Sequence, residues 1–423
     1  MTVIQRIEKP ACGCGIEAGH KNLISIDEAF ARIAATVRPI DGAEDVPVGA
    51  AKGRILAHSV RSLGMVPPFD NAAMDGYAIR SSDLVGPGPW RLQVTDRVAA
   101  GQVRNQSLAS NTAIQVFTGA PVPDGADAVV MQENVIRTGD YIMLPSKVSP
   151  RTNIRSVGED MPAGKIIGTA GQALTVRSIA AFAAAGHATV PVHRRVRVAL
   201  LITGDEVHQA GQARGPAGIW DVNTPMLSAA LQSPEIDLRI VQTAKDSRPE
   251  LQSQLSDMAK CVDLLITTGG ISVGEADHVK PALAALGAET IFSGVALKPG
   301  KPVSFGRIGS TLWLGLPGNP LSALVTWMMF GKTICDALSG RAQDQVLRRN
   351  VVLSEPLRHT PGRCEMRLAR LCGFDGMGRE VVEFAPVTHS ARVGDLSPMD
   401  GLLLVPGEAA TLPGGAIVEF LPF

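Results

Sequence analysis

The sequence has few of the features that define several common classes of protein. Only 4% of its 423 residues are aromatic. Surfaces for single-stranded nucleic acid stack bases on aromatic rings, so such a surface is not expected. The 40 basic and 40 acidic residues cancel, so the chain lacks the basic excess that a nucleic-acid backbone requires. Its apolar runs are shorter than the ~18 residues that span a bilayer. We therefore expect neither a nucleic-acid nor a membrane partner.

The N-terminal sequence, MTVIQRIEKP, lacks the apolar segment of a secretory signal. Six cysteines in 423 residues are too few for a disulfide framework, and a cytoplasmic protein keeps them reduced. A cytoplasmic location is therefore expected. Residues 1–21 are Gly-rich and aperiodic and are expected to form a disordered tail. Cys12 and Cys14, with His20 nearby, leave open a soft-metal site in that tail.

Several familiar catalytic motifs are also absent. The chain has no G-x-x-x-x-G-K-[ST], which excludes a P-loop NTPase. It has no H-E-x-x-H and its eight histidines are dispersed, so a His-ligated zinc site is not expected. The glycines at 269, 270 and 274 do not follow G-x-G-x-x-G, so a dinucleotide-binding fold has weak support.

The first half of the chain combines short helices with a β-rich region. Helices are predicted over residues 26–37, 48–56 and 174–185, and short strands over 91–94, 113–117, 128–132 and 141–144. Ser25 and Glu28 form a capping-box pattern before the first helix. Residues 66–79 contain two prolines, so this segment is predicted to be neither a regular helix nor a central strand.

A change of pattern at Arg194 marks a second region. Strands are predicted over 196–202, 238–243, 262–267 and 311–315, and helices over 226–231, 249–259, 279–286 and 321–338. This alternation predicts a doubly wound α/β sheet. Asn223 is predicted to cap the first of these helices, and residues 290–297 and 303–305 to form a hairpin. After Gly340, strands over 351–353, 366–371, 381–384, 402–405 and 416–420 predict a small all-β domain.

Residues 264–280 carry the strongest indication of a site. A buried strand ends at a Gly pair, and a loop with Gly274, Glu275 and Asp277 follows. Loops at the carboxyl ends of parallel strands bind ligands in open α/β sheets. Glycines let backbone N–H groups approach an anion. Two carboxylates beside a phosphate repel it unless a hard cation bridges them. The loop therefore predicts a metal-assisted phosphate-ester site.

Right-handed crossovers bring other loops to the same edge of the sheet. These loops add the acids Asp205, Glu206, Asp221 and Asp246, and the cations Lys280, Lys298 and Lys301. Acids so gathered raise one another's pKa unless a cation such as Mg²⁺ offsets them. Any one of these charges is adequately explained as a solvated loop residue, whereas the set favours a site. The polar cluster of Asp70, Asn71 and Asp75 leaves two explanations open, a functional loop and ordinary turn chemistry.

Eight motifs in register resemble the molybdopterin molybdenumtransferase family, which includes bacterial MoeA and the E domain of gephyrin. They are Pro-Phe-Asp-Asn-Ala-Ala-Met-Asp-Gly-Tyr-Ala (68–78), Thr-Gly-Ala-Pro-Val-Pro (118–123), Val-Val-Met-Gln-Glu (129–133), Asn-Ile-Arg-x-x-Gly-Glu-Asp (153–160), Thr-Gly-Asp-Glu (203–206), Gly-Gly-Ile-Ser-Val-Gly-Glu-Ala-Asp (269–277), Lys-Pro-Gly-Lys-Pro (298–302) and Gly-Leu-Pro-Gly-Asn-Pro (315–320). The resemblance runs from about Ser25 to the C-terminus. It departs from the family at Thr267-Thr268, where a Ser pair is frequent, and at Val222, where Thr is frequent.

The resemblance implies a homodimer of multidomain subunits in which α/β and β domains combine. The implied domains are a connecting dimerisation domain (22–68 and 150–193), a β-rich domain (69–149), a MogA-like molybdopterin-binding α/β domain (194–341) and a C-terminal β-barrel-like domain (345–423). The implied reaction inserts molybdate into adenylylated molybdopterin, with Mg²⁺-dependent release of AMP. Implied partners are a MogA-like adenylyltransferase and molybdoenzyme chaperones.

The family's functional residues map onto matching positions of this chain. The implied catalytic residues are Asp75, Thr118, Glu206, Asp246 and Asp277, and the implied metal ligands are Glu206, Asp246 and Asp277. The implied substrate-binding residues are Gly269, Gly270, Ser272, Gly274, Lys298, Lys301, Pro317, Gly318, Asn319 and Pro320. In the family, the cleft lies between the β-rich domain of one subunit and the α/β and C-terminal domains of the other. Asp75 and Thr118 are then expected to act in trans to Glu206 and Asp277.

Two other functions compete with this one. One is an adenylyltransferase or hydrolase that uses the same kind of α/β domain, as MogA-like proteins do. Release of AMP from adenylylated molybdopterin in the presence of molybdate and Mg²⁺ separates it from the first. The other is a non-enzymatic scaffold or cofactor carrier, against which the retention of all the matching acids argues. An Asp277→Ala variant with full cofactor-forming activity would favour the scaffold.

Overall fold

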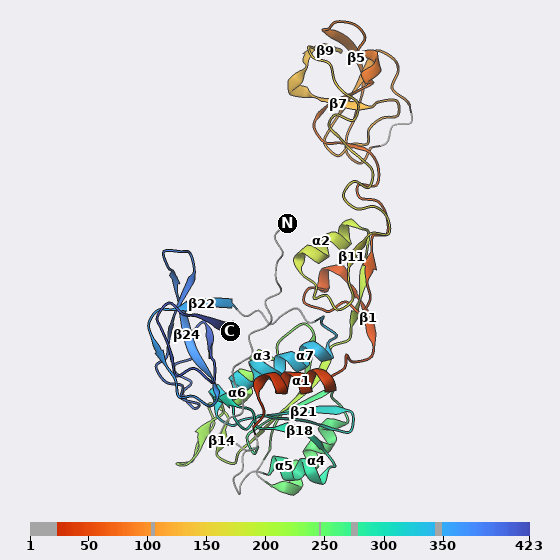
Figure 1. Cartoon of the computed structure of the whole chain (residues 1–423). Coiled ribbons are helices and arrows are strands. Elements are labelled where there is room, and N and C mark those ends of the chain that lie inside the picture. The colour runs from red at the N-terminus through yellow and green to blue at the C-terminus, as the bar shows by residue number, and fades with distance from the viewer. Residues whose placement is uncertain (1–22, 103–105, 245–246, 272–277, 343–348) are drawn as a thin grey trace.

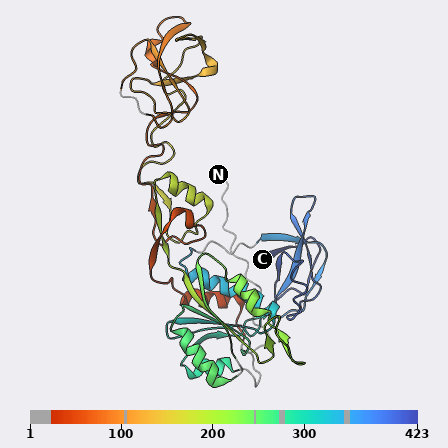
Figure 2. The same ribbon diagram turned by 180° about the vertical axis from the view of Figure 1, so that it is seen from behind.

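The computed structural model describes residues 23–102, 106–244, 247–271, 278–342 and 349–423. The described chain forms an extended molecule with a β-rich lobe at one end and an α/β unit at the other (Figure 1). A small connecting unit lies between them, and a C-terminal β unit lies beside the α/β unit, as the view from behind also shows (Figure 2). The molecule therefore has separate hydrophobic cores rather than one.

The connecting unit is built from short pairs of strands and one helix. Strand β1 (Ala43–Pro47) pairs with β12 (Thr189–His193), and β2 (Val60–Arg61) with β11 (Ile166–Gly168). Helix α2 (Val176–Ala184) begins at the Thr175 capping box and buries Phe182 in the core of this unit. Segments far apart in the sequence thus meet here and support the lobe between them.

The β-rich lobe is a six-stranded sheet in the order β7-β4-β6-β5-β9-β8. Its strands are β4 (Gly76–Ile79), β5 (Trp90–Val98), β6 (Thr112–Val116), β7 (Ala128–Met131), β8 (Ile136–Thr138) and β9 (Tyr141–Leu144). Below it, β3 (Asn71–Ala72) pairs with β10 (Ile154–Arg155). Alternating side chains fill one apolar core on each face of the sheet.

The α/β unit is a six-stranded sheet in the order β16-β13-β17-β21-β20-β18. The parallel strands are β13 (Val196–Thr203), β16 (Ile236–Ala244), β17 (Leu264–Thr268) and β21 (Thr311–Leu316). Strands β20 (Ser304–Ile308) and β18 (Glu289–Ser293) extend it as antiparallel neighbours. The four parallel strands were predicted, whereas the mixed edge was not.

Helices cover both faces of this sheet, as a doubly wound fold requires. One face packs on α1 (Ile26–Thr36), α3 (Asn223–Ala230), α6 (Pro320–Thr326), the π-helical turn η4 (Trp327–Gly331) and α7 (Lys332–Leu338). The other packs on α4 (Arg248–Ala259) and α5 (Val279–Ala285). Helix α1 lies in the segment that we assign to the connecting domain, yet its buried face packs in the α/β core.

The helical segment Pro320–Leu338 is apolar and long enough to cross a membrane, but 67% of its apolar window is buried inside the molecule. It packs against the central sheet and supplies Phe330, which is fully buried. This burial is that of a core helix.

The C-terminal unit is a small barrel closed by five strands. Strands β24, β25, β22, β28 and β26 follow one another, and β24 also pairs with β26. Their bounds are β22 (Arg349–Leu353), β24 (Cys364–Phe374), β25 (Glu380–Phe384), β26 (Gly401–Val405) and β28 (Ile417–Pro422). Met366, Leu368 and Leu402 belong to the same core as the α/β unit. The barrel and the α/β unit are therefore packed together.

Three local predictions were wrong. The predicted helix over 48–56 is only the 3-10 turn η1 (Val48–Ala50), because Gly49 and Gly53 disfavour a helix. Strand β4 is central in its sheet, since both prolines of the segment over 66–79 precede it. The third prediction, a hairpin of residues 290–297 and 303–305, was wrong only in part: β18 and β20 pair as its two antiparallel strands, whereas β19 (Leu297–Lys298) pairs with β24 of the barrel.

Candidate functional site

The strand order of the α/β unit changes direction between β13 and β17, and we call the switch point at their carboxyl ends the crevice. The chain runs from β13 outward to β16, then returns to β17 on the other side of β13. Ligands bind at such a switch of direction in open α/β sheets. Thr203 ends β13 and Thr268 ends β17 at this point. The Gly pair of the sequence analysis follows immediately.

The backbone at Gly269 has little room for a side chain. Its φ is +84°, a left-handed conformation, and a Cβ placed there would lie 2.7 Å from Thr203 Oγ1 and 2.8 Å from Thr203 O. Its N–H donates to the carbonyl of Leu316 at 3.2 Å. Glycine is therefore required where the ends of three neighbouring strands converge.

Asn223 joins two of the predicted site loops. Its Nδ2 donates to Thr268 Oγ1 at 3.0 Å and to the carbonyl of Gly318 at 2.7 Å. Only 8% of Asn223 is exposed, and its buried Oδ1 has no hydrogen-bond partner among the described residues. The predicted capping role was wrong, because Asn223 is the first residue of the helix and it is Asp221 Oδ1 that accepts from Thr224 N in the first turn. Asn223 holds the two loops together at the crevice.

The acids of the predicted set have different environments. Glu206 is exposed beyond the end of β13, and its Oε2 lies 2.9 Å from the position that a Cβ on Gly204 would take. Its carboxylate therefore lies over the strand end. Asp221 is buried, and its carboxylate accepts from Thr224 N. Asp246, Ser272, Gly274, Glu275 and Asp277 lie outside the described residues, so their predicted roles stay predictions.

Of the three predicted metal ligands, the structure describes Glu206, so the fit of this edge to a hard cation is judged on Glu206. Within the described ranges, no group of three or more His, Cys, Asp or Glu side chains gathers to hold a metal ion. Glu206 provides exposed carboxylate oxygens, the donor type that Mg²⁺ takes. The other two predicted ligands, Asp246 and Asp277, come shortly after β16 and β17 in the sequence.

The Lys298–Lys301 loop lies between the α/β unit and the barrel. Strand β19 pairs in parallel with β24, with Lys298 opposite Glu365. The Lys298 ammonium lies 3.2 Å from Glu365 Oε1, and 37% of its side chain is exposed. Lys301 is exposed, and its carbonyl accepts from Val295 N at 3.0 Å, which closes the loop. Both cations thus belong to one turn at the junction. Lys280 donates to Ser293 Oγ at 3.0 Å.

The Pro317–Pro320 loop connects β21 to α6 and also contacts the barrel. Pro317 is buried, whereas Gly318 and Asn319 are exposed. Asn319 Nδ2 donates to Ser390 Oγ at 3.1 Å, and Leu321 N donates to the carbonyl of Ser390 at 3.1 Å. Ser390 lies in the connection between β25 and β26 of the barrel. The barrel therefore holds two of the predicted site loops.

Asp75 and Thr118 form a separate pair in the lobe. Asp75 Oδ1 accepts hydrogen bonds from the backbone N and from Oγ1 of Thr118, each at 2.7 Å. These two hydrogen bonds hold the pKa of Asp75 below its usual value. Asp75 and Thr118 are therefore in contact, but the lobe lies at the opposite end of the molecule from the α/β unit (Figures 1 and 2). One subunit does not bring this pair to the crevice.

The sequence analysis missed the polar cluster behind Lys298. Glu365 and Arg367 of β24 have 1% and 5% of their surface exposed. Glu365 lies against Lys298, and Arg367 and His359 lie against Glu365. Two charged residues at i and i+2 within an apolar strand share one face. That pattern in Cys-Glu-Met-Arg-Leu (364–368) was the available signal.

Comparisons with protein families match most of the chain. Residues 24–186 match the MoeA N-terminal region (domain I and II). Residues 199–336 match a probable molybdopterin binding domain. The two matches meet near the pattern change at Arg194 and include the crevice and the lobe.

Curated relatives and solved structures agree with these matches. A molybdopterin molybdenumtransferase of Haemophilus influenzae is 34% identical over 322 residues, 76% of this chain and 79% of that protein. Molybdopterin molybdenumtransferase 2 of Mycobacterium tuberculosis is 33% identical over 88% of this chain and 93% of that protein. A crystal structure of a molybdopterin biosynthesis MoeA protein from Pyrococcus horikoshii OT3 superposes with a TM-score of 0.80. It has 26% identity and covers 95% of this chain and 100% of that chain.

Proposed function

The chain belongs to the molybdopterin molybdenumtransferase family, and from this premise we propose that it inserts molybdate into adenylylated molybdopterin with Mg²⁺-dependent release of AMP. Its place in molybdenum cofactor biosynthesis, as a transferase, follows from the family itself. The proposal adds the adenylylated form of the substrate, the metal and the leaving group. It also adds a cytoplasmic homodimer that works with a MogA-like adenylyltransferase and with molybdoenzyme chaperones.

The crevice at the ends of β13 and β17 carries the proposal. It combines the turn at Gly269 and Gly270, where no side chain obstructs an anion, with the ammonium groups of Lys298 and Lys301 at the junction with the barrel. Phosphate and molybdate are both tetrahedral oxyanions, and such a turn and such cations suit either. The edge thus has the chemistry to bind a phosphorylated substrate and molybdate together.

Mg²⁺, when bound, would supply charge neutralisation on the diphosphate that joins AMP to molybdopterin. Glu206, Asp246 and Asp277 are the residues that would hold it. This chain's own contribution is positional. Asn223 fixes the loops that follow β17 and β21, and Lys298 provides a cation that is oriented by the barrel. Fixed groups around a phosphoryl centre lower the barrier because they do not reorganise during the reaction.

A second copy of the chain would complete the site. Asp75 and Thr118 lie in the lobe, at the far end of the subunit from the crevice (Figure 1). The two segments that join the connecting unit to the lobe, residues 62–75 and 153–161, expose large apolar side chains, as an interface would. These are Leu63 (67%), Met65 (49%), Phe69 (43%), Met74 (44%) and Val157 (44%). We therefore propose that Asp75 acts in trans to Glu206.

The first experiment incubates the protein with adenylylated molybdopterin, molybdate and Mg²⁺. We expect release of AMP together with formation of molybdenum cofactor, both dependent on Mg²⁺. Absence of both products contradicts the proposal. Transfer of AMP from ATP to molybdopterin would instead identify the adenylyltransferase alternative.

The second experiment mixes two inactive variants, Asp75→Asn and Glu206→Gln. If the site is shared between subunits, a mixed dimer has one site with both residues intact. A mixed dimer purified through two different affinity tags should then have about half of the wild-type activity, since one of its two sites is intact. No recovery in a purified mixed dimer, or sedimentation of the wild type as a monomer, argues against the shared site.

A further inference from the structure

A buried carboxylate from the barrel lies directly behind Lys298. Strands β19 and β24 run parallel, and their register places Lys298 opposite Glu365, so both side chains project from the same face. Lys298 Nζ lies 3.2 Å from Glu365 Oε1. The Glu365 side chain is 1% exposed, while that of Lys298 is 37% exposed. The pair therefore has one end in the protein interior and the other at the surface of the junction.

The second carboxylate oxygen of Glu365 is held from inside the barrel. Arg367 Nη2 lies 3.3 Å from Oε2 and His359 Nε2 lies 3.6 Å from it, and both side chains are almost fully buried. Burial by itself would raise the pKa of Glu365, but a hydrogen bond from Thr388 and the charge of Arg367 outweigh it and lower the pKa. Glu365 is thus ionised when it meets Lys298.

The groups that hold Glu365 are themselves fixed by backbone carbonyls. Arg367 Nη1 donates to the carbonyl of Pro386 at 3.1 Å, and Nη2 donates to that of Arg358 at 2.5 Å. His359 Nδ1 pairs with the carbonyl of Ala409 at 2.8 Å. Each member therefore has one orientation set by the barrel frame. A rigid carboxylate can restrict a lysine, whose long stem otherwise samples many rotamers.

We propose that Glu365 is a positioning residue for Lys298, fixing its ammonium where it binds the tetrahedral oxyanion of the substrates. This inference rests on the proposed function, which makes Lys298 a substrate-binding residue. Glu365 neutralises part of the Lys298 charge, and the Arg367 guanidinium behind it offsets that loss, so a positive field remains at the exposed side. The barrel thereby contributes to the site without contacting the substrate through Glu365.

The test compares Glu365→Gln, Lys298→Ala and the double variant with the wild type. Gln keeps the shape of Glu but removes the charge. The matched control is Glu383→Gln, which removes an exposed carboxylate paired with Arg370 between β24 and β25 of the same barrel. Two readouts are used: kcat and KM for molybdate during AMP release, and binding of molybdate alone by calorimetry. Thermal melting confirms that each variant is folded.

A positioning role predicts that Glu365→Gln lowers kcat/KM for molybdate by ~10-fold or more. Adding it to Lys298→Ala should cause no further loss, because residues that act through one another are not additive. Molybdate binding should weaken in the same variants, and Glu365→Asp should recover part of the loss. Glu383→Gln should stay within ~2-fold of the wild type, as for an exposed pair.

Removing one partner of a buried ion pair can prevent folding. The variant Glu365→Gln/Arg367→Met removes both buried charges, a change that proteins often tolerate. It still leaves Lys298 without its carboxylate, so the same loss of kcat/KM and of molybdate binding is expected.

Two results would overturn the inference. One is a folded Glu365→Gln or Glu365→Gln/Arg367→Met protein with wild-type kinetic and binding constants. The other is a Glu365→Gln effect that multiplies fully with that of Lys298→Ala, which is the result for a purely structural residue. Failure of the proposed function is distinguishable, because the wild type would then release no AMP while the calorimetric comparison of molybdate binding still tests Glu365.

Discussion

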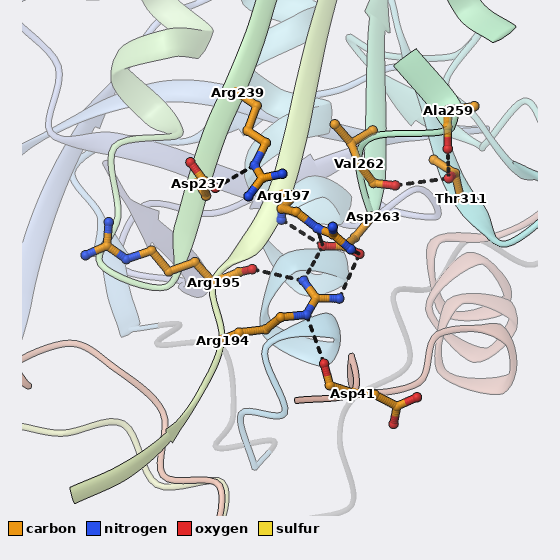
Figure 3. Close-up of polar contacts among 10 residues, drawn as sticks. All are labelled: Asp41, Arg194, Arg195, Arg197, Asp237, Arg239, Ala259, Val262, Asp263 and Thr311. Atoms are coloured by element: carbon orange, nitrogen blue, oxygen red, sulfur yellow. Dashed lines mark hydrogen bonds and ion pairs between the residues drawn. The ribbon is translucent and has the colours of Figure 1, made fainter. Parts of the chain in front are cut away.

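Replacing Asp263 with Ala tests the polar cluster at the amino-terminal end of the central sheet (Figure 3). Asp263 precedes β17, and its carboxylate accepts hydrogen bonds from both Arg194 and Arg197. The distances are 2.7 and 3.0 Å to the two Nη atoms of Arg194. They are 2.9, 3.2 and 3.0 Å to N, Nε and Nη2 of Arg197. Arg194 Nε also donates to the carbonyl of Asp41 at 2.9 Å, which connects the cluster to the chain after α1.

The exposure of the partners sets the size of the effect. The Asp263 side chain is 11% exposed, whereas those of Arg194 and Arg197 are 29% and 36% exposed. Breaking a buried ion pair costs ~3–5 kcal/mol, and breaking an exposed one costs ~0–1 kcal/mol. Because water can hydrate the two guanidinium groups again, Asp263→Ala should lower the free energy of unfolding by about 2–3 kcal/mol at pH 7.

This loss should depend on pH with a defined sign. Burial alone would raise the pKa of Asp263, but the hydrogen bonds from Arg194 and Arg197 lower it well below its usual range. In the unfolded chain an Asp has a pKa of about 3.9, so acid protonates the unfolded state first. The stabilisation by Asp263 is therefore fully present above about pH 5. It is lost as the pH falls below about 4 toward the lowered native pKa.

The assay is urea unfolding followed by tryptophan fluorescence, since Trp313 and Trp327 are buried in the α/β unit. Asp237→Ala is the matched control, because Asp237 pairs with Arg239 at 2.7 Å on the same edge but both side chains are well exposed. It should cost less than about 1 kcal/mol. Equal losses in the two variants, or a difference between Asp263→Ala and the wild type that grows as the pH falls below 4, would refute the reasoning.

Two further predictions concern the crevice. Gly269→Ala should lower both stability and activity, since its Cβ would lie 2.7 Å from Thr203 Oγ1 in a left-handed backbone. Urea unfolding should show that the free energy of unfolding falls by more than about 1 kcal/mol. A wild-type stability would contradict the steric argument. Asn223→Leu should separate the loops at Thr268 and Gly318 and reduce AMP release by at least ~10-fold; an active variant with a wild-type KM for molybdate would show that the bridge is dispensable.

Much of the fold could be predicted because its signals are local. The parallel strands of the α/β unit, four of the six strands of the lobe (β5, β6, β7 and β9) and the five strands of the barrel lie within a few residues of their predicted positions. An apolar run between turn residues needs no distant partner to be recognised. Ser25 also behaves as predicted, because its hydroxyl caps the first helix.

Predictions from local sequence patterns were wrong where a contact with a residue far away in the sequence decided the structure. Asn is a common helix cap, yet the side-chain amide of Asn223 donates to Thr268 and Gly318, which lie 45 and 95 residues later in the sequence. Strand β19 was expected in a hairpin, but the barrel edge at Cys364 pairs with it instead. Neither choice can be read from the neighbouring residues, because each depends on which groups the fold brings within hydrogen-bond reach.

For the site, the sequence by itself was enough to predict which loops carry the chemistry: the glycines after β17, the Lys298–Lys301 turn, the Pro317–Pro320 loop and the Asp75–Thr118 pair. Those assignments follow from residue types and motifs, which need no coordinates. Only the tertiary structure decided that the loops after β17 and β21 meet at Gly269 and Gly318, that the Lys298 ammonium lies beside Glu365 of the barrel, and that the lobe with Asp75 lies at the far end of the subunit. The reason is physical: distances between residues far apart in the chain are set by the packing of separate cores, and a motif carries no information about that packing.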